Sequence, residues 1–171
     1  MEWGTRVMRL RRRAHRSAAV RSLGPLGPAR RPDATLVVAA LAYRGVTTAV
    51  LDEPVRQLAE RLHADVVFVG VEVGTVPGVE PARPVVVTHT PDDAPSADVL
   101  VVPGGLGWRQ VIGDDSIRSW LADASATARG LLAMSTGSLL LGSVGRLSGR
   151  EAAGHWLAES ELAELGAVVS G

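Results

Sequence analysis

Apolar runs and amphipathic stretches alternate along most of the chain. The apolar runs are short, uninterrupted and rich in valine and leucine, which is typical of strands buried in a parallel sheet. They occupy residues 34–42, 65–71, 85–87, 98–102 and 130–134. Between the first two runs, residues 47–62 carry apolar side chains at spacings of three and four, which predicts an amphipathic helix. Its spaced residues are Leu51, Val55, Leu58 and Leu62.

Two further helices are predicted in the second half of the chain. Asp114 and Asp115 can cap a helix that continues to Ala128, because their carboxylates accept hydrogen bonds from the first backbone amides. Its buried side is expected to hold Ile117 and Leu121. A shorter helix is predicted over residues 158–165, with Gly166 as its C-terminal cap.

The remaining segments complete a regular order of elements. Residues 74–84 contain three prolines and are interpreted as turns, and residues 167–169 begin another strand. Strands that alternate with helices in this way predict an α/β fold, with a parallel sheet and helices on both of its faces.

The formal net charge is zero, but basic residues concentrate at the N-terminus. Residues 1–31 contain nine arginines and one glutamate and show no apolar periodicity. We therefore expect residues 1–31 to be an Arg-rich disordered tail and residues 32–171 to form one domain. Deleting the tail should leave the melting temperature nearly unchanged. Nucleic-acid binding is not indicated, because no aromatic residues are interleaved with the arginines.

Composition narrows the possible chemistry. Apolar residues make up 46% of the chain, which is enough for a core. The sequence contains no cysteine, so disulfides, thiolate chemistry and cysteine-based metal sites are excluded. No apolar run approaches the roughly 20 residues of a membrane-spanning helix. We predict no metal, no cofactor and no membrane association.

The strongest chemical signal is a small polar residue between a predicted strand and a predicted helix. The run at residues 131–134 leads directly into Ser135, Thr136 and Gly137, and leucines follow. This order is typical of a nucleophile elbow, which lifts one side chain above the sheet edge toward the positive end of a helix. His155 follows twenty residues later and can reach back over the site.

Several motifs in this part of the chain resemble the DJ-1/PfpI superfamily, and most of all its isonitrile hydratase-like and regulator-like branch. They are Ser135-Thr136-Gly137-Ser138, Gly145-Arg146-Leu147-Ser148-Gly149 and Ala152-Ala153-Gly154-His155-Trp156. The segment Val101-Val102-Pro103-Gly104-Gly105 matches a second signature of the same family. The resemblance covers residues 34–168 and implies a flavodoxin-like sheet similar to that of class I glutamine amidotransferases.

The resemblance also implies a site and a biological setting. It assigns the oxyanion hole, a pair of backbone N–H donors, to Gly105 and Thr136, beside Ser135 as the catalytic position. Gly104 lets the backbone approach a ligand closely. On spacing alone, Pro103 to Gly105 is equally well explained as a tight turn. We expect a cytoplasmic homodimer that binds a small molecule and needs no cofactor.

Two residues depart from the family pattern. The family's reactive cysteine is Ser135 here, and the family's carboxylate aligns with Val50. Asp52 and Glu53 lie near that position but are displaced from it. A serine hydroxyl needs a positioned base, and His155 is the candidate. We therefore expect the hydratase or hydrolase activity of the family to be weak or absent.

Other interpretations stay open. Ser135 and His155 could form a working hydrolase pair, with Glu151 as the nearest acid to orient the histidine. Residues 133–137 also lie one residue from the Gly-x-Ser-x-Gly elbow of serine hydrolases. The chain could instead be the ligand-sensing domain of a regulator-like protein, or a degenerate fragment. Family members continue beyond residues 167–169, so we expect a C-terminally truncated domain.

Overall fold

The computed structural model describes residues 35–79, 83–152 and 158–169, so the predicted tail lies outside the described residues. The centre of the fold is a four-stranded parallel sheet with the strand order β2-β1-β5-β6. Its strands are β1 (Val37–Leu41), β2 (Asp65–Val69), β5 (Val99–Val102) and β6 (Gly130–Ala133). Each strand falls inside a predicted apolar run, which confirms the parallel α/β fold.

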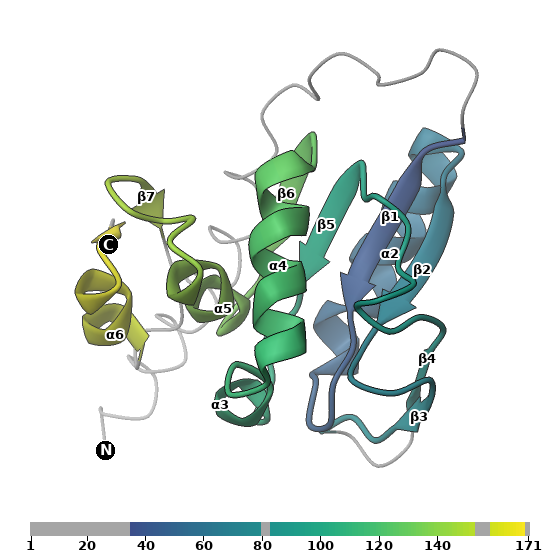
Figure 1. Ribbon diagram of the computed structural model, residues 1–171, viewed down its shortest axis with the longest axis horizontal. Coiled ribbons are helices and arrows are strands. Elements are labelled where there is room, and N and C mark those ends of the chain that lie inside the picture. Colours follow the sequence, from purple (N-terminus) through teal and green to yellow (C-terminus); the bar gives the residue numbers. More distant parts are fainter. Residues whose placement is uncertain (1–34, 80–82, 153–157, 170–171) are drawn as a thin grey trace, which may run out of the picture.

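Two helices cover opposite faces of the sheet. α2 (Asp52–Leu62) joins β1 to β2, and α4 (Asp115–Thr127) joins β5 to β6. These two connections run in opposite directions across the sheet, so right-handed crossovers place their helices on opposite faces. Figure 1 shows α4 in front of the sheet and α2 behind it. Helices on both faces explain why all four residues of β5 are buried.

The helical positions predicted from spacing face the core. Leu51 is fully buried immediately before α2, and Val55 is 4% exposed on it. On α4, Ile117 and Leu121 are each 1% exposed. The Asp114 carboxylate accepts the N–H groups of Ser116 and Ile117 at 3.0 and 3.1 Å, so the predicted N-cap is confirmed. The Asp114 carboxylate thus satisfies two of the first backbone amides of α4, while Ile117 and Leu121 hold the helix against the core.

Asp98 ties the amino ends of three strands together. Its Oδ2 accepts the N–H of Val37 at 3.0 Å, and its backbone oxygen accepts the N–H groups of Arg129 and Gly130. Its Oδ1 lies 3.5 Å from the Arg129 guanidinium, and both side chains are about 15% exposed. One half-buried carboxylate therefore holds β1, β5 and β6 in register.

Two predictions of local structure need correction. Residues 47–62 are not one helix: a 3₁₀ turn, η1 (Thr48–Val50), precedes α2. Pro54 has no N–H to donate to Val50, so the α-helix begins only just before it. Residues 74–84 are not all turn, because β3 (Gly74–Val76) pairs antiparallel with β4 (Val85–Val87). The hairpin forms because Val85 and Val87 bury their side chains against the core.

The C-terminal elements form a smaller layer of their own. The elements are α5 (Gly137–Ser143), β7 (Glu151–Ala152), α6 (Glu159–Glu164) and β8 (Val168–Val169). Gly166 follows α6 with φ +83°, as expected for the predicted cap. The strand predicted at residues 167–169 pairs with β7 in a separate two-stranded sheet. Figure 1 shows β7 and α6 beside α5, away from the main sheet.

A second apolar cluster joins this layer to the rest of the domain. It contains Leu139, Ala158, Leu162 and Ala167. Leu139 lies on α5, and its neighbours Leu140 and Leu141 belong to the main core. α5 therefore packs on both the main core and the C-terminal layer. Within the described segments, no helix is long and apolar enough to span a membrane.

Candidate functional site

Ser135 occupies the turn between β6 and α5, as the sequence predicts. Its φ is +54°, a left-handed conformation that costs about 1–2 kcal/mol for a residue other than glycine. The N–H of Met134 still follows the sheet ladder to Val102 O at 3.0 Å, and the N–H of Gly137 closes the turn on Met134 O at 2.9 Å. The chain therefore reverses at Ser135 itself and leaves its side chain half-buried at the carboxyl edge of the sheet.

Glycine is required where the neighbouring loop passes the elbow. A Cβ on Gly104 would lie 2.8 Å from the Ser135 Cβ and from the Thr136 nitrogen. A Cβ on Gly137 would lie 2.0 Å from the Val102 carbonyl oxygen. These distances are shorter than real Cβ contacts, so only glycine allows the β5 loop and the elbow to touch. The structure thus brings Gly104 beside Ser135, as the family resemblance implied.

Thr136 links the elbow to the second glycine of the β5 loop. The N–H of Gly105 donates a hydrogen bond to the Thr136 Oγ1 at 3.0 Å, and the Thr136 hydroxyl lies 3.3 Å from the Gly105 oxygen. Gly105 and Thr136 are therefore adjacent. The Gly105 N–H, however, is directed at a side chain and not at open space. Sequence reasoning considered only the Thr136 amide and missed this role of its hydroxyl.

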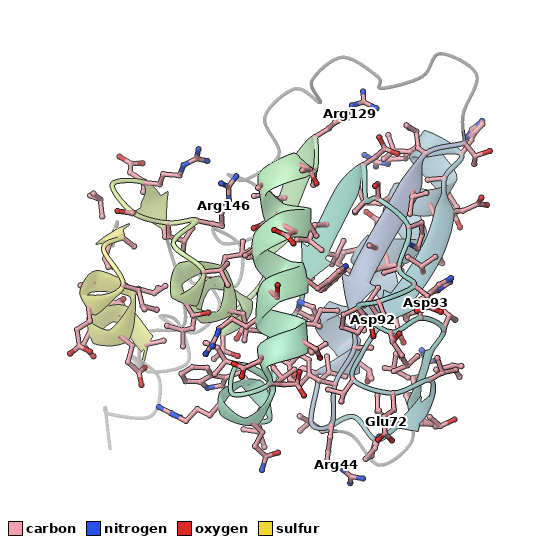
Figure 2. All side chains as sticks on the ribbon, viewed as in Figure 1. Arg44, Glu72, Asp92, Asp93, Arg129 and Arg146 are labelled. Carbon is pink, nitrogen blue, oxygen red and sulfur yellow. The ribbon has the colours of Figure 1, made fainter. Side chains whose placement is uncertain are left out.

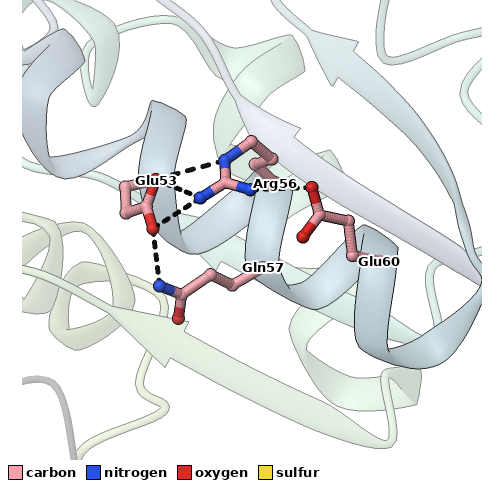
Figure 3. Close-up of polar contacts among 4 residues, drawn as sticks. All are labelled: Glu53, Arg56, Gln57 and Glu60. Carbon is pink, nitrogen blue, oxygen red and sulfur yellow. Dashed lines mark hydrogen bonds and ion pairs between the residues drawn. The ribbon is translucent and has the colours of Figure 1, made fainter.

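The structure places the three residues that the sequence analysis considered for the position of the family's carboxylate. Val50 ends η1 and packs, half-buried, against the main core. The Asp52 carboxylate pairs with Arg83 at 3.1 Å. Glu53 lies on the exposed side of α2, where it accepts hydrogen bonds from Arg56 at 2.8 Å and from Gln57 at 2.6 Å (Figure 3). The Arg56 hydrogen bond is the main reason that the pKa of Glu53 is lowered, and both carboxylate oxygens are engaged on α2 by Arg56 and Gln57.

A base for Ser135 is not found in the part of the chain that the structure describes. The Ser135 hydroxyl makes no hydrogen bond to any residue in segments 35–79, 83–152 and 158–169, although its backbone oxygen accepts the Ser138 hydroxyl at 2.9 Å. His155 lies outside the described residues. Glu151 is described, and it is exposed on β7. Within the described parts of the chain, no group of three or more potential ligands could hold a metal ion.

The loops after β1 and β5 meet at the point where the strand order reverses. In sheets of this type, that point is where ligands bind. Here the backbones of the two loops approach closely: a Cβ on Gly105 would lie 2.2 Å from Gly45 O, and one on Gly107 would lie 1.9 Å from Arg44 O. The Tyr43 hydroxyl adds a buried hydrogen bond to Pro103 O at 3.0 Å. Burial raises the pKa of Tyr43, so this phenol stays protonated.

Comparison with known proteins agrees with this geometry. The sequence profile of the DJ-1/PfpI family matches residues 37–171. Isonitrile hydratase from Pseudomonas putida is 38% identical over 81 residues, which are 47% of this chain and 36% of that enzyme.

Solved structures show the same fold. A THiJ/PfpI family protein from Pseudomonas syringae has a TM-score of 0.73 at 29% identity, over 86% of this chain and 64% of its own. DJ-1 from Schizosaccharomyces pombe has a TM-score of 0.63 at 14% identity, over 79% of this chain and 76% of its own. The chain spans about a third of the hydratase and less than two thirds of the P. syringae protein.

Proposed function

The chain belongs to the DJ-1/PfpI family, and on that basis we propose that it is a small-molecule-binding domain whose hydratase or hydrolase chemistry is weak or absent. One observation carries the proposal. The catalytic position of the elbow holds Ser135, and the position of the family's carboxylate holds Val50, which packs into the core. Both partners of the reactive pair are altered together.

The chemistry of serine explains the expected loss. A cysteine thiol with a pKa of about 8.5 becomes a thiolate when a helix terminus stabilises the charge. Such a terminus contributes about 0.3–1 kcal/mol per charge at exposed sites. Enzymes lower their barriers by about 8 kcal/mol or more. A helix of only seven residues following Ser135 cannot supply that difference to a hydroxyl, so a serine here needs a base.

The ligand class is proposed from the relative with a named substrate. Isonitrile hydratase, by its name, adds water to an isonitrile. In this chain such a small electrophile would bind beside the Ser135 turn, between Gly104 and the Thr136 amide. The Gly105 N–H is bonded to the Thr136 hydroxyl, so a ligand oxygen would have to displace that hydroxyl to use the second donor. We therefore expect binding to be weak.

A restoration experiment tests the proposal. Wild type, Ser135→Cys and the double variant Ser135→Cys with Val50→Asp are incubated with cyclohexyl isonitrile, and formamide production is followed by NMR. We expect no turnover from wild type, and a gain in the double variant because thiol and carboxylate are both returned. Circular dichroism and thermal melting of each variant establish that it is folded. Val50→Asn with Ser135→Cys is the matched control, because it has the same shape without the charge.

Two results would contradict the proposal. Turnover by wild type that Ser135→Ala abolishes would make Ser135 a working nucleophile, and loss of that turnover in His155→Ala would identify the hydrolase pair. A folded double variant no more active than the Val50→Asn control would mean that the missing carboxylate is not what limits the site.

A further inference from the structure

A cavity separate from the elbow lies at the carboxyl ends of β1 and β2. Its volume is about 410 Å³, within the range of small-molecule sites. Residues after β1, residues between β2 and β3, and residues around α3 (Trp108–Val111) and the start of α4 line it. None of Ser135, Gly104 and Thr136 is among its lining residues. Gly107, which follows β5, and Tyr43, which follows β1, are also among its lining residues.

Arg44 and Glu72 bring opposite charges to this cavity. Arg44 follows β1 and Glu72 follows β2, and Figure 2 shows both side chains at the same end of the molecule, beside the β3–β4 hairpin. Neither the Arg44 guanidinium nor the Glu72 carboxylate makes a hydrogen bond or an ion pair with another described residue. The nearby Asp52 and Arg83, by contrast, are paired with one another. Two lining residues of opposite charge are thus available to a ligand.

Asp114 adds a second, fixed carboxylate to the lining. Its Oδ1 takes all of the capping hydrogen bonds from Ser116 and Ile117, which leaves Oδ2 free of them. The Ser116 hydroxyl and the Ile117 amide lower the pKa of Asp114, so it is ionised at neutral pH. The charged lining therefore consists of one cation and two anions.

Aliphatic side chains complete the lining. Val71 and Val73 are 47% and 61% exposed, and the buried Val111 of α3 is a further lining residue. Exposed valines beside a cavity gain from burial against an apolar group. The cavity thus offers an arginine, two carboxylates and an aliphatic surface together.

We propose that this cavity binds a zwitterionic amino acid with an aliphatic side chain. The carboxylate pairs with Arg44, whose planar guanidinium matches it in shape and charge. The ammonium group pairs with Glu72 and Asp114, and the side chain packs on Val71 and Val73. A simple carboxylate would face two like charges, and a simple amine would face Arg44 without compensating it. A ligand with both groups meets both signs of charge in the lining.

Calorimetric titration of the full chain with L-leucine tests this proposal. Isocaproate lacks only the ammonium group of leucine, and isoamylamine lacks only its carboxylate, so they are matched ligands. We expect leucine to bind and each analogue to bind about tenfold or more weakly, because a charge-assisted contact is lost. Arg44→Gln and Glu72→Gln should each weaken leucine binding by a similar factor.

Two control variants locate the ligand. Arg61→Gln removes an exposed arginine of α2 outside the cavity and should leave leucine binding unchanged. Ser135→Ala, at the elbow, should also leave it unchanged. The proposal is overturned if wild type does not bind leucine, if either analogue binds as well as leucine, if Arg44→Gln and Glu72→Gln have no effect, or if Ser135→Ala abolishes binding.

Discussion

Adding one methyl group at Gly104 measures how tightly the elbow is held. In Gly104→Ala the new Cβ meets the Ser135 Cβ, the Thr136 nitrogen and the Met134 oxygen at 2.8, 2.8 and 2.9 Å. Two of these three atoms belong to the backbone of the elbow, so they cannot move aside without shifting the turn. The φ of Gly104 is not positive, and alanine is therefore free of backbone strain there.

Two opposing contributions set the change in the free energy of unfolding that Gly104→Ala causes. Overpacking of this kind costs about 1–3 kcal/mol, and rigid backbone contacts favour the upper part of that range. Alanine also restricts the unfolded chain, which stabilises by about 0.4–1 kcal/mol. The free energy of unfolding should therefore fall by about 2 kcal/mol. For a chain of this size, that lowers the melting temperature by about 4–8 °C.

Gly113→Ala is the matched control. It also lacks a positive φ, but its new Cβ would come no closer than 3.3 Å to any atom. It shares the entropic contribution and adds only a mild crowding of the Gln110 carbonyl oxygen at 3.3 Å, so it should be clearly less destabilising than Gly104→Ala. Urea denaturation of both variants measures the difference. If Gly104→Ala is as stable as Gly113→Ala, then the elbow moves freely and the reasoning about its rigidity is wrong.

Three further predictions concern the contacts that position the site. Asp98→Ala should lower the free energy of unfolding by about 1–3 kcal/mol in urea titrations, because it removes the acceptor of the Val37 N–H and the carboxylate that faces Arg129; a loss no larger than that of a typical exposed substitution would contradict this role of Asp98. Tyr43→Phe should cost about 1 kcal/mol through the lost bond to Pro103 O, and an unchanged midpoint would refute it. Asp114→Ala should cost about 1 kcal/mol in urea at neutral pH. Because the folded pKa of Asp114 is lowered, its contribution is complete above the unfolded pKa and disappears as pH falls through the folded pKa; a gap between wild type and variant that persists below both would refute this.

The sequence was sufficient for features that depend on local pattern. Each strand of the four-stranded sheet falls within a predicted apolar run, and Asp114 indicates a helix start because a carboxylate before an apolar-periodic stretch caps it. The position of Ser135 between strand and helix was equally clear. The family pattern then placed Gly104 and Gly105 beside it, and the structure brings all of them together.

What the sequence did not reveal depends on contacts between distant segments. The β3–β4 hairpin was hidden by prolines, and it forms because Val85 and Val87 find a core to enter. The bond from Gly105 to the Thr136 hydroxyl joins residues 31 positions apart, and no pattern encodes a side-chain rotamer.

The strand order also has a consequence for the path by which the chain folds. β1 meets β2 through partners 28 residues apart, whereas β1 meets β5 through partners 61 residues apart. Doubling a loop adds only about 0.6 kcal/mol of closure entropy, but this favours β1, α2 and β2 pairing first. Pulse-labelled amide exchange should then show β1 and β2 protected before β5, and the reverse order would exclude this route. The loops after β1 and β5 meet only when β5 pairs with β1. The elbow site and the neighbouring cavity would therefore form late in folding.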